Sequence, residues 1–110
     1  MEIKEIGEVK SVVMIPRFDA FVAKEIECEF IDMIEKGSSK ILCDFSQTEY
    51  ISSAGLRVLL VAAKKLQQND GKLILCNMGS YVHEVFETSG FTKLFEVYNT
   101  EEQALKSLSK

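Results

Sequence analysis

The sequence predicts an α/β fold: a single domain over residues 1–110, with about four helices packed on a mixed, mainly parallel sheet of four to five strands. One observation is that, after two opening strands, short apolar runs alternate with longer amphipathic segments. Another is that the runs KILCDF (40–45) and KLILCN (72–77) are almost continuously apolar, which is typical of strands covered on both faces. The predicted order is β-β-α-β-α-β-α-β-α, and the length is ordinary for one domain.

The first third of the chain contains two predicted strands and a helix. The segment MEIKEIGEVKSVVMIP predicts short strands on either side of Gly7, the second ending at Pro16, because proline cannot donate to a strand ladder. From 20 to 36, apolar residues recur at three- and four-residue spacing, which predicts an amphipathic helix. Asp19 precedes this segment as its expected N-cap, and Gly37 follows it as its expected C-terminal cap.

The rest of the sequence predicts two further helices, a last strand and a C-terminal helix around the two buried runs. The segment 52–71 predicts a second helix, which is apolar all round in its middle and so has little surface to expose to water. A short helix is expected at 80–90, with Ser80 as its cap, followed by a strand at 94–98. Thr100 stands three residues before a glutamine, in capping-box register for a last helix that continues to the end.

The composition argues against a nucleic-acid or membrane partner. The formal net charge is −4, and there is no basic stripe that would neutralise phosphates. The longest apolar runs are far shorter than the ~20 residues of a membrane span, and the charged, alternating start does not resemble a signal peptide. We therefore expect a cytoplasmic protein that binds neither nucleic acid nor membrane.

The residue types that most often hold metals or carry redox chemistry are scarce. Cys28, Cys43 and Cys76 include no CxxC pair, and two of the three lie within apolar runs. We expect buried or half-buried free thiols in a reducing compartment, with no zinc and no other cofactor. His83 is the only histidine, and we expect it at the surface, without an acidic or cysteine partner at ligand spacing.

The motifs of common enzymes are missing from the sequence. For Ser53 to be the nucleophile of a G-x-S-x-G elbow, a glycine would have to replace Ile51. The chain contains neither the G-x-x-x-x-G-K-[ST] phosphate loop nor the G-x-G-x-x-G fingerprint. The sequence therefore predicts a protein that is not an enzyme, with a small α/β nucleotide-binding enzyme as an alternative.

The most informative stretch is TEYISSAGLRVLL (48–60), in which two serines and a glycine stand where a strand turns into a helix. If the helix begins near Ala54, Ser53 lies at or next to its N-cap, where unpaired backbone N–H groups and the helix dipole attract anions. A phosphate on Ser53 would be accommodated there. Arg57, about one turn further on, could add a charge-assisted hydrogen bond.

The same residues also have a purely structural explanation. Ser52 or Ser53 would then only cap the helix, as serines commonly do. Gly55, which costs up to ~1 kcal/mol relative to alanine in a first helical turn, would only allow the helix to pack closely. The residues by themselves leave both interpretations open.

The stretch DFSQTEYISSAGLRVLL (44–60) resembles the signature of the bacterial anti-sigma factor antagonists, stand-alone members of the STAS (sulfate transporter and anti-sigma factor antagonist) domain family. That signature has an aspartate that ends a strand, a hydrophobic residue, a few polar residues, an aromatic and a hydrophobic residue, and then Asp-Ser-[Ser/Thr/Ala]-Gly-[Leu/Ile]. The segments RFDAFVAKEIE and VFETSGFTKLFEVYNTEEQAL are similar to family elements before and after it, so the resemblance covers nearly the whole chain.

The resemblance implies a partner-switching regulator of transcription. Such a protein binds an anti-sigma factor that is itself a serine kinase, and a sigma factor is thereby released. The kinase uses ATP and magnesium to phosphorylate the antagonist and then dissociates, and a PP2C-type phosphatase restores the serine. Ser53 matches the phosphorylated serine, Gly55 the glycine that follows it and Asp19 the acidic residue beside it. The expected partner-binding residues are Asp19, Ser52, Ser53, Ala54, Gly55 and Arg57.

Some positions depart from the family pattern or have two explanations. Ser52 stands where many members have an aspartate, which removes a charge from the docking surface and offers a second hydroxyl as the acceptor. Arg57 is not carried over from the family, and its expected role rests on helix geometry. Asp44 either orients the serine loop or only caps a turn. Phe21 and Cys28 lie off the main apolar stripe of the first helix, and either pack at its flank or belong to a docking face.

The family resemblance also leaves a different binding function open. A STAS domain can serve as a module of a transporter-associated or other signalling complex without being phosphorylated. Phosphorylation of Ser53 by a kinase partner would distinguish the anti-sigma factor antagonist from such a module.

Overall fold

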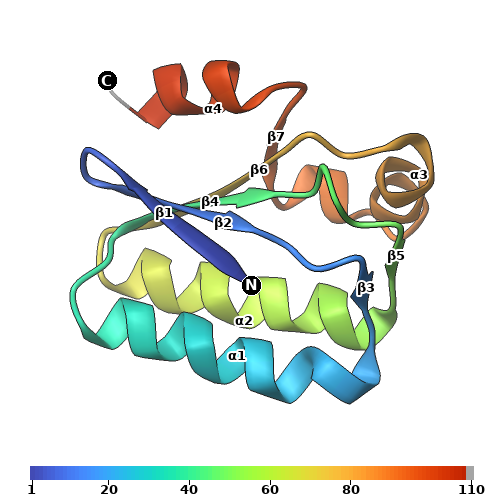
Figure 1. The fold of residues 1–110 in the computed structure, drawn as a ribbon, viewed down its shortest axis with the longest axis horizontal. Coiled ribbons are helices and arrows are strands. Elements are labelled where there is room, and N and C mark those ends of the chain that lie inside the picture. Colours follow the sequence, from blue (N-terminus) through green and yellow to red (C-terminus); the bar gives the residue numbers. More distant parts are fainter. Residues whose placement is uncertain (109–110) are drawn as a thin grey trace.

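Five strands form the central sheet of the computed structural model, which describes residues 1–108 (Figure 1). The strands are β1 (Glu2–Ile6), β2 (Val9–Val13), β4 (Lys40–Asp44), β6 (Lys72–Cys76) and β7 (Glu96–Tyr98). Their spatial order is β1-β2-β4-β6-β7. β1 pairs antiparallel with β2, and all the other neighbours pair in parallel, which confirms the predicted mixed, mainly parallel sheet.

Helices cover both faces of this sheet. In the described residues they are α1 (Ala20–Glu35), α2 (Ser53–Gln68), α3 (Ser80–Thr88) and α4 (Glu101–Leu108), with a short 3-10 helix, η1 (Phe91–Lys93), after α3. α1 and α2 lie side by side on one face, α4 lies on the other, and α3 stands at one end (Figure 1). Asp19 caps α1, and Gly37 follows its C-cap with φ at 105°, both as predicted. The predicted Thr100 cap of α4 is also present, since its Oγ1 accepts from Gln103 N at 3.1 Å.

A second, smaller sheet is not predicted by the sequence. β3 (Arg17–Phe18) pairs in parallel with β5 (Tyr50–Ile51). Each strand is only two residues long, too short for the alternation that identifies a strand in a sequence. The pairing joins the segments that directly precede α1 and α2.

Three predicted boundaries are wrong. β2 ends at Val13 rather than at Pro16, because its partner β4 ends at the position opposite Val13. Gly79, not Ser80, is the N-cap of α3, since its backbone is extended and Ser80 is already helical. The last strand is shorter than the predicted 94–98, because the preceding residues 91–93 form η1 and the strand starts only at Glu96.

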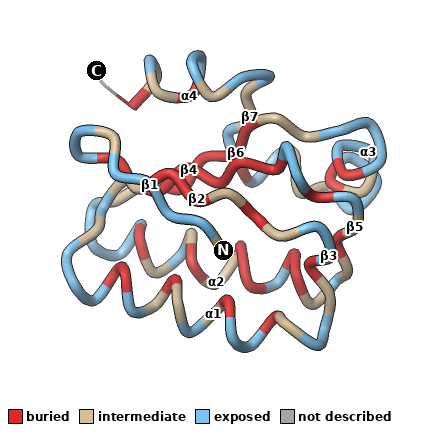
Figure 2. The backbone as a smooth tube through the Cα atoms, viewed as in Figure 1, coloured by how far each residue is buried: buried red, intermediate tan, exposed pale blue. Residues whose placement is uncertain are grey.

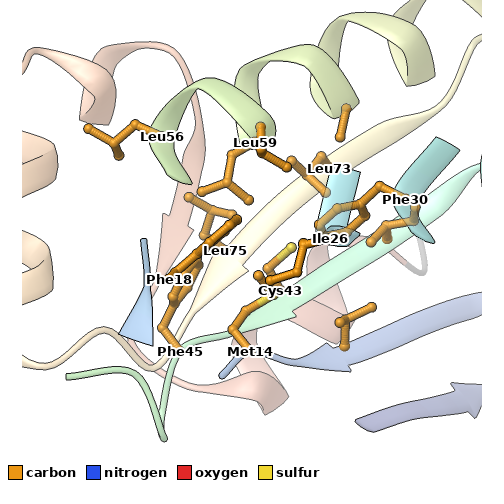
Figure 3. Packing of buried hydrophobic residues seen from close by; sticks show 14 of the residues in the cluster. Met14, Phe18, Ile26, Phe30, Cys43, Phe45, Leu56, Leu59, Leu73 and Leu75 are labelled. Atoms are coloured by element: carbon orange, nitrogen blue, oxygen red, sulfur yellow. The ribbon is translucent and has the colours of Figure 1, made fainter. Parts of the chain in front are cut away.

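Buried apolar side chains form one cluster on each face of the sheet. The larger cluster fills the space between the sheet and helices α1 and α2, and it includes Phe18, Ile26, Phe30, Cys43, Leu59 and Leu75 (Figure 3). The smaller cluster lies on the α4 side and consists of Val9, Leu42, Ile74, Cys76, Ala104 and Leu108. Successive residues of β4 and β6 thus enter opposite clusters, which explains their continuously apolar sequences. Figure 2 shows the same concentration of buried residues in the central strands.

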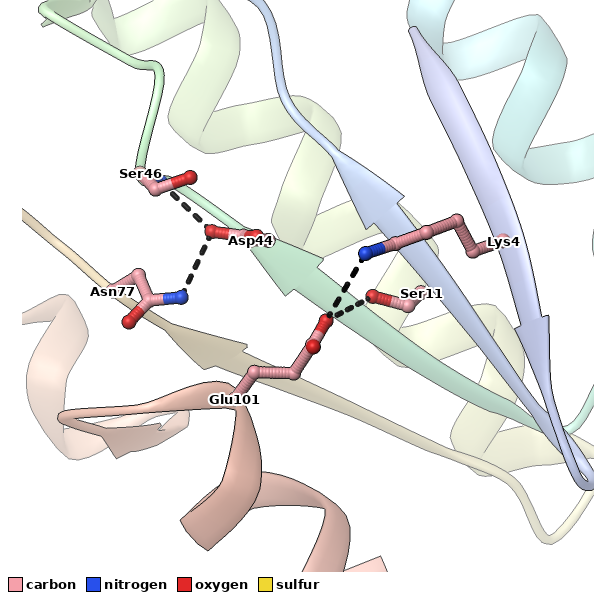
Figure 4. Close-up of polar contacts among 6 residues, drawn as sticks. All are labelled: Lys4, Ser11, Asp44, Ser46, Asn77 and Glu101. Atoms are coloured by element: carbon pink, nitrogen blue, oxygen red, sulfur yellow. Dashed lines mark hydrogen bonds and ion pairs between the residues drawn. The ribbon is translucent and has the colours of Figure 1, made fainter.

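Polar contacts also hold α4 against the sheet. Ser11 of β2 is fully buried, and its Oγ donates to Glu101 Oε2 over 2.8 Å. Lys4 Nζ of β1 lies 3.9 Å from the same carboxylate oxygen (Figure 4). Because a buried hydroxyl is costly unless it is hydrogen-bonded, the Ser11–Glu101 bond fixes where the start of α4 lies.

Candidate functional site

The β3–β5 pair brings the starts of α1 and α2 together at one end of the molecule (Figure 1). Asp19 directly follows β3, and Ser52 directly follows β5. The backbone N–H of Ser52 donates to the Phe18 carbonyl over 3.0 Å, which extends the pairing up to the start of α2. The structure thus places Asp19 and the serine turn at neighbouring ends of the β3–β5 pair.

Ser52 is the N-cap of α2, and its hydroxyl is already engaged. Its Oγ accepts from the Gly55 N–H at 3.3 Å and lies within donating distance of the Phe18 carbonyl at 3.5 Å. The side chain is half-buried. The structural explanation of the sequence therefore holds for this serine: it caps the helix.

Ser53 differs from its neighbour in exposure and in hydrogen bonding. It is the first residue of α2 and is exposed to solvent. Within residues 1–108 its hydroxyl makes no hydrogen bond, and the backbone N–H groups of Ser53 and Ala54 have no acceptor. The first turn of α2 contains no acidic residue that would occupy these donors. An exposed hydroxyl thus stands beside two unused amide donors at the positive end of a helix dipole.

Gly55 is buried under β3 and β5. A Cβ at this position would lie 2.7 Å from the Phe18 carbonyl oxygen and 2.9 Å from Ile51 Cγ1. Any larger residue would push the first turn of α2 off the small sheet. The glycine therefore allows the close packing that sets the position of Ser53.

A chain of polar and aromatic contacts runs from Asp19 across the small sheet. The Asp19 Oδ1 atom accepts from the Phe21 N–H at 3.0 Å, and Oδ2 lies 3.7 Å from Arg17 Nε. The Arg17 guanidinium lies 4.6 Å from the centre of the Tyr50 ring, and Tyr50 stacks on Tyr81 of α3 with ring centres 6.3 Å apart. Sequence reasoning missed Arg17, Tyr50 and Tyr81 as neighbours of the site, because the unpredicted β3–β5 pairing brings Arg17 to Tyr50 and the packing of α3 brings Tyr81 to it.

A hollow lies between the N-terminal halves of α1 and α2. Its volume is about 270 Å³. Its lining includes Ala20, Ala23, Lys24 and Glu27 of α1 and Ala54 and Arg57 of α2. Arg57 is exposed, and within residues 1–108 the structure gives it no ion pair. The hollow thus joins the Ser53 region to the start of α1.

The loop between β4 and β5 is held in place by Asp44 and Thr48. The Asp44 Oδ1 atom accepts from the Ser46 N–H at 2.9 Å and from Asn77 Nδ2 at 3.1 Å (Figure 4). Thr48 Oγ1 donates to the Ile15 carbonyl over 2.9 Å. Asp44 therefore caps its own turn and also ties the serine loop to the end of β6, so the two sequence explanations are compatible.

The remaining candidate residues lie apart from this end of the molecule or do not form a site. Cys43 and Cys76 are buried; burial raises the pKa of the Cys76 thiol to about 12 and also raises that of Cys43. Cys28 is exposed, contrary to the prediction. His83 is exposed as predicted, but it does have an acidic neighbour, since Nδ1 lies 3.3 Å from Glu87. Among the described residues, no three His, Cys, Asp or Glu side chains gather to hold a metal.

Comparison with known proteins identifies the family. The sequence profile of the STAS domain matches residues 1–104. The chain therefore belongs to the STAS domain family. Across residues 1–108, no helix is both long and apolar enough to cross a membrane.

Several of the proteins that this chain resembles are described as anti-sigma factor antagonists. BtrV of Bordetella bronchiseptica, described as a candidate anti-sigma factor antagonist, is 45% identical over 82 residues, which cover 74% of this chain and 71% of BtrV. The crystal structure of TM1081 from Thermotoga maritima, also described as a candidate antagonist, has a TM-score of 0.93 at 21% identity, covering 99% of this chain and 94% of TM1081. The phosphorylated form of the Bacillus cell fate determinant SpoIIAA has a TM-score of 0.75 at 21% identity, covering 97% of each chain. At 21% identity, each of these two solved structures shows that this chain has the same fold.

Proposed function

We propose that this protein is an anti-sigma factor antagonist, which binds an anti-sigma factor with serine kinase activity and is released when that kinase phosphorylates Ser53. Membership of the STAS family supports the proposal, as does the relative BtrV, which is described as a candidate anti-sigma factor antagonist. The shared fold with SpoIIAA, a protein known in a phosphorylated form, agrees with it. In this role the protein is a cytoplasmic binding regulator and not itself an enzyme.

The observation that carries the proposal is the state of the Ser53 side chain. A kinase needs a hydroxyl that it can reach, and Ser53 is exposed and free of hydrogen bonds within residues 1–108. Ser52 is the weaker candidate, since its hydroxyl caps Gly55 and is half-buried. Phosphorylating Ser52 would cost this cap, which typically contributes about 1 kcal/mol to a helix.

The transfer itself requires chemistry that the kinase brings. The Ser53 oxygen attacks the γ-phosphorus of magnesium-bound ATP, the bond from that phosphorus to the β-phosphate oxygen breaks, and ADP leaves. The hydroxyl proton passes to a base on the kinase. A PP2C-type phosphatase later hydrolyses the ester with water, which returns the serine and releases inorganic phosphate.

The start of α2 is suited to carry the resulting phosphate. Its two unused N–H groups, those of Ser53 and Ala54, are within the first turn and can donate to phosphate oxygens. Arg57 lies one turn further on and can add a charge-assisted bond. The phosphate brings nearly two negative charges, which a partner docked against this turn must desolvate or expel. The protein therefore tolerates the modification while its complex does not.

Phosphorylation with radiolabelled ATP and the cognate anti-sigma kinase tests the proposal. We expect label on wild-type protein and on Ser52→Ala, and none on Ser53→Ala. Both variants should remain folded, although Ser52→Ala should unfold at a lower temperature because it loses the α2 cap. A stable complex without any label would instead favour the unphosphorylated STAS module, and label on Ser53→Ala would contradict the assignment of the acceptor.

A further inference from the structure

We infer that Phe21 is an apolar anchor that inserts into a hydrophobic pocket on the kinase that acts on Ser53. The inference rests on the proposed function and identifies a residue that sets the affinity of that partner. It follows from the exposure of Phe21, from its position and from the way its backbone is held.

Phe21 is almost completely exposed. The residue is 97% exposed, compared with 60% for Leu94 and 52% for Tyr81, the next most exposed large apolar residues described. Phe21 contributes nothing to the core, because α1 buries a different set of residues: Ala23, Ile26, Phe30, Met33 and Ile34. Phenylalanine is also a poorer helix former than alanine, so its presence does not serve the helix. A ring in this position stabilises nothing in the free protein.

A single exposed apolar residue is ordinary on a protein surface. What distinguishes Phe21 is its place in the first turn of α1, which the β3–β5 pair holds next to the first turn of α2. Ala20, its neighbour, lines the same hollow as Ala54, the neighbour of Ser53. Packed helices lie about 8–10 Å apart, so the two first turns are at most a few side chains from each other.

A kinase that reaches Ser53 must also cover the start of α1. Phosphoryl transfer requires the reacting atoms to approach within about 3–3.5 Å. A standard protein interface buries about 800 Å² on each partner, which corresponds to a disc of roughly 16 Å radius. The whole molecule measures only 30 × 28 × 24 Å, so a disc of that size centred on Ser53 includes the first turn of α1.

The backbone of Phe21 is fixed before any partner binds. Its N–H donates to the Asp19 carboxylate over 3.0 Å, and Asp19 is also held by Arg17 at 3.7 Å. A residue that is already positioned loses less entropy on binding. Aromatic side chains bury about 150–250 Å² each, which makes them frequent anchors at interfaces. Phe21 therefore combines a rigid base with a large unused apolar surface at the edge of the acceptor site.

Titration calorimetry tests this inference, with the anti-sigma kinase that phosphorylates Ser53 of the wild-type chain as the probe, together with a non-hydrolysable ATP analogue. We expect Phe21→Ala to raise the Kd at least about tenfold, and Phe21→Leu to retain most of the affinity. Leu94→Ala is the matched control, because Leu94 is also exposed but lies with Gln67 and Gly71 near the opposite end of α2. Its Kd should equal that of the wild type.

A kinetic readout separates an anchor from a catalytic residue. For Phe21→Ala, the KM of the kinase for this protein substrate should rise about tenfold while kcat stays the same. Thermal unfolding should match the wild type, because the ring makes no buried contact.

Three outcomes would overturn the inference. If Phe21→Ala binds as tightly as wild type while Ser53 is still phosphorylated, Phe21 is no anchor and the proposed function stands. If no anti-sigma kinase binds or phosphorylates the wild type, the proposed function fails and the inference fails with it. If sedimentation shows a wild-type dimer that Phe21→Ala abolishes, with kinase affinity unchanged, Phe21 contacts a second copy of this chain and not the kinase.

Discussion

The starts of α2 and α4 are built in opposite ways. α4 begins with Glu101 and Glu102, and the Glu101 carboxylate also receives the buried Ser11 hydroxyl and the nearby Lys4 ammonium. α2 begins with Ser53 and has no acidic residue in its first turn. The positive end of the α4 dipole is thus compensated within the protein, whereas that of α2 is left for an added anion.

The difference separates a structural serine, Ser11, from the serine that we propose is regulatory, Ser53. Ser11 is fully buried and hydrogen-bonded, so no enzyme can reach it and its loss would affect folding. Ser53 is exposed and unbonded within residues 1–108, so its loss would affect folding little. Ser52 is intermediate in exposure, and its hydroxyl is hydrogen-bonded. It occupies the position where the family pattern often places an aspartate. A neutral cap there keeps the start of α2 free of negative charge until a phosphate is added.

The largest effect on stability is expected for Gly55→Ala. The added Cβ would lie 2.7 Å from a backbone carbonyl oxygen, which cannot move without shifting β3. Overpacking of this kind costs about 1–3 kcal/mol and outweighs the gain in helix propensity, which is at most about 1 kcal/mol. Chemical denaturation should show the loss, together with slower phosphorylation because Ser53 is displaced.

Gly79→Ala serves as the control for this substitution. A Cβ at Gly79 meets nothing within 4 Å. It should therefore cost no more than the usual loss of a favourable N-cap residue, about 1 kcal/mol, and leave phosphorylation unchanged. Equal losses for the two glycines would show that the packing of α2 on the small sheet is not what Gly55 provides.

A smaller effect is expected for Ser11→Ala, at the start of α4. Removal of the hydroxyl eliminates one bond to Glu101, which keeps its contact with Lys4. The free energy of unfolding should fall by about 0.5–1.5 kcal/mol, the usual net contribution of a hydrogen bond. Affinity for the anti-sigma kinase should not change, since α4 covers the opposite face of the sheet from α1 and α2 (Figure 1). A loss of affinity without a loss of stability would mean that α4 belongs to the partner surface.

The smallest effect is expected for Arg57→Ala, and only after phosphorylation. The unphosphorylated variant should unfold like the wild type, because Arg57 is exposed and has no ion pair within residues 1–108. In the phosphorylated protein the variant should lose about 0.3–1 kcal/mol, the contribution of one charge interaction at an exposed helix start. Comparison of the melting temperatures of the four proteins measures this difference. The same shift in both states would exclude a contact between Arg57 and the phosphate.

The sequence was sufficient where local chemistry determines the structure. The apolar runs at β4 and β6, the Asp19 cap and the two serines at the start of α2 each follow from residue type and spacing, and the structure has all of them. The STAS resemblance of residues 44–60 is confirmed by the family match. The site residues themselves stay predictions, which the substitutions above address.

The sequence was insufficient where residues distant along the chain meet. β3 and β5 have two residues each, and their pairing depends on the larger sheet that already holds β2 and β4 together. Without that pairing, neither the contact of Arg17 with Tyr50 nor the packing of Gly55 on Phe18 can be foreseen. At α3, Gly79 rather than the serine is the cap, because glycine adopts the extended cap conformation without a side-chain bond.

The most direct test of the central claim compares the wild-type protein with and without phosphate on Ser53. Both forms are titrated into the cognate anti-sigma kinase by calorimetry, and both are unfolded by heat. We predict that phosphorylation weakens binding at least about tenfold, a change of about 1.4 kcal/mol, while the melting temperature stays the same or rises. Equal affinity of the two forms would contradict the account, because the start of α2 would then carry a phosphate that its partner does not detect.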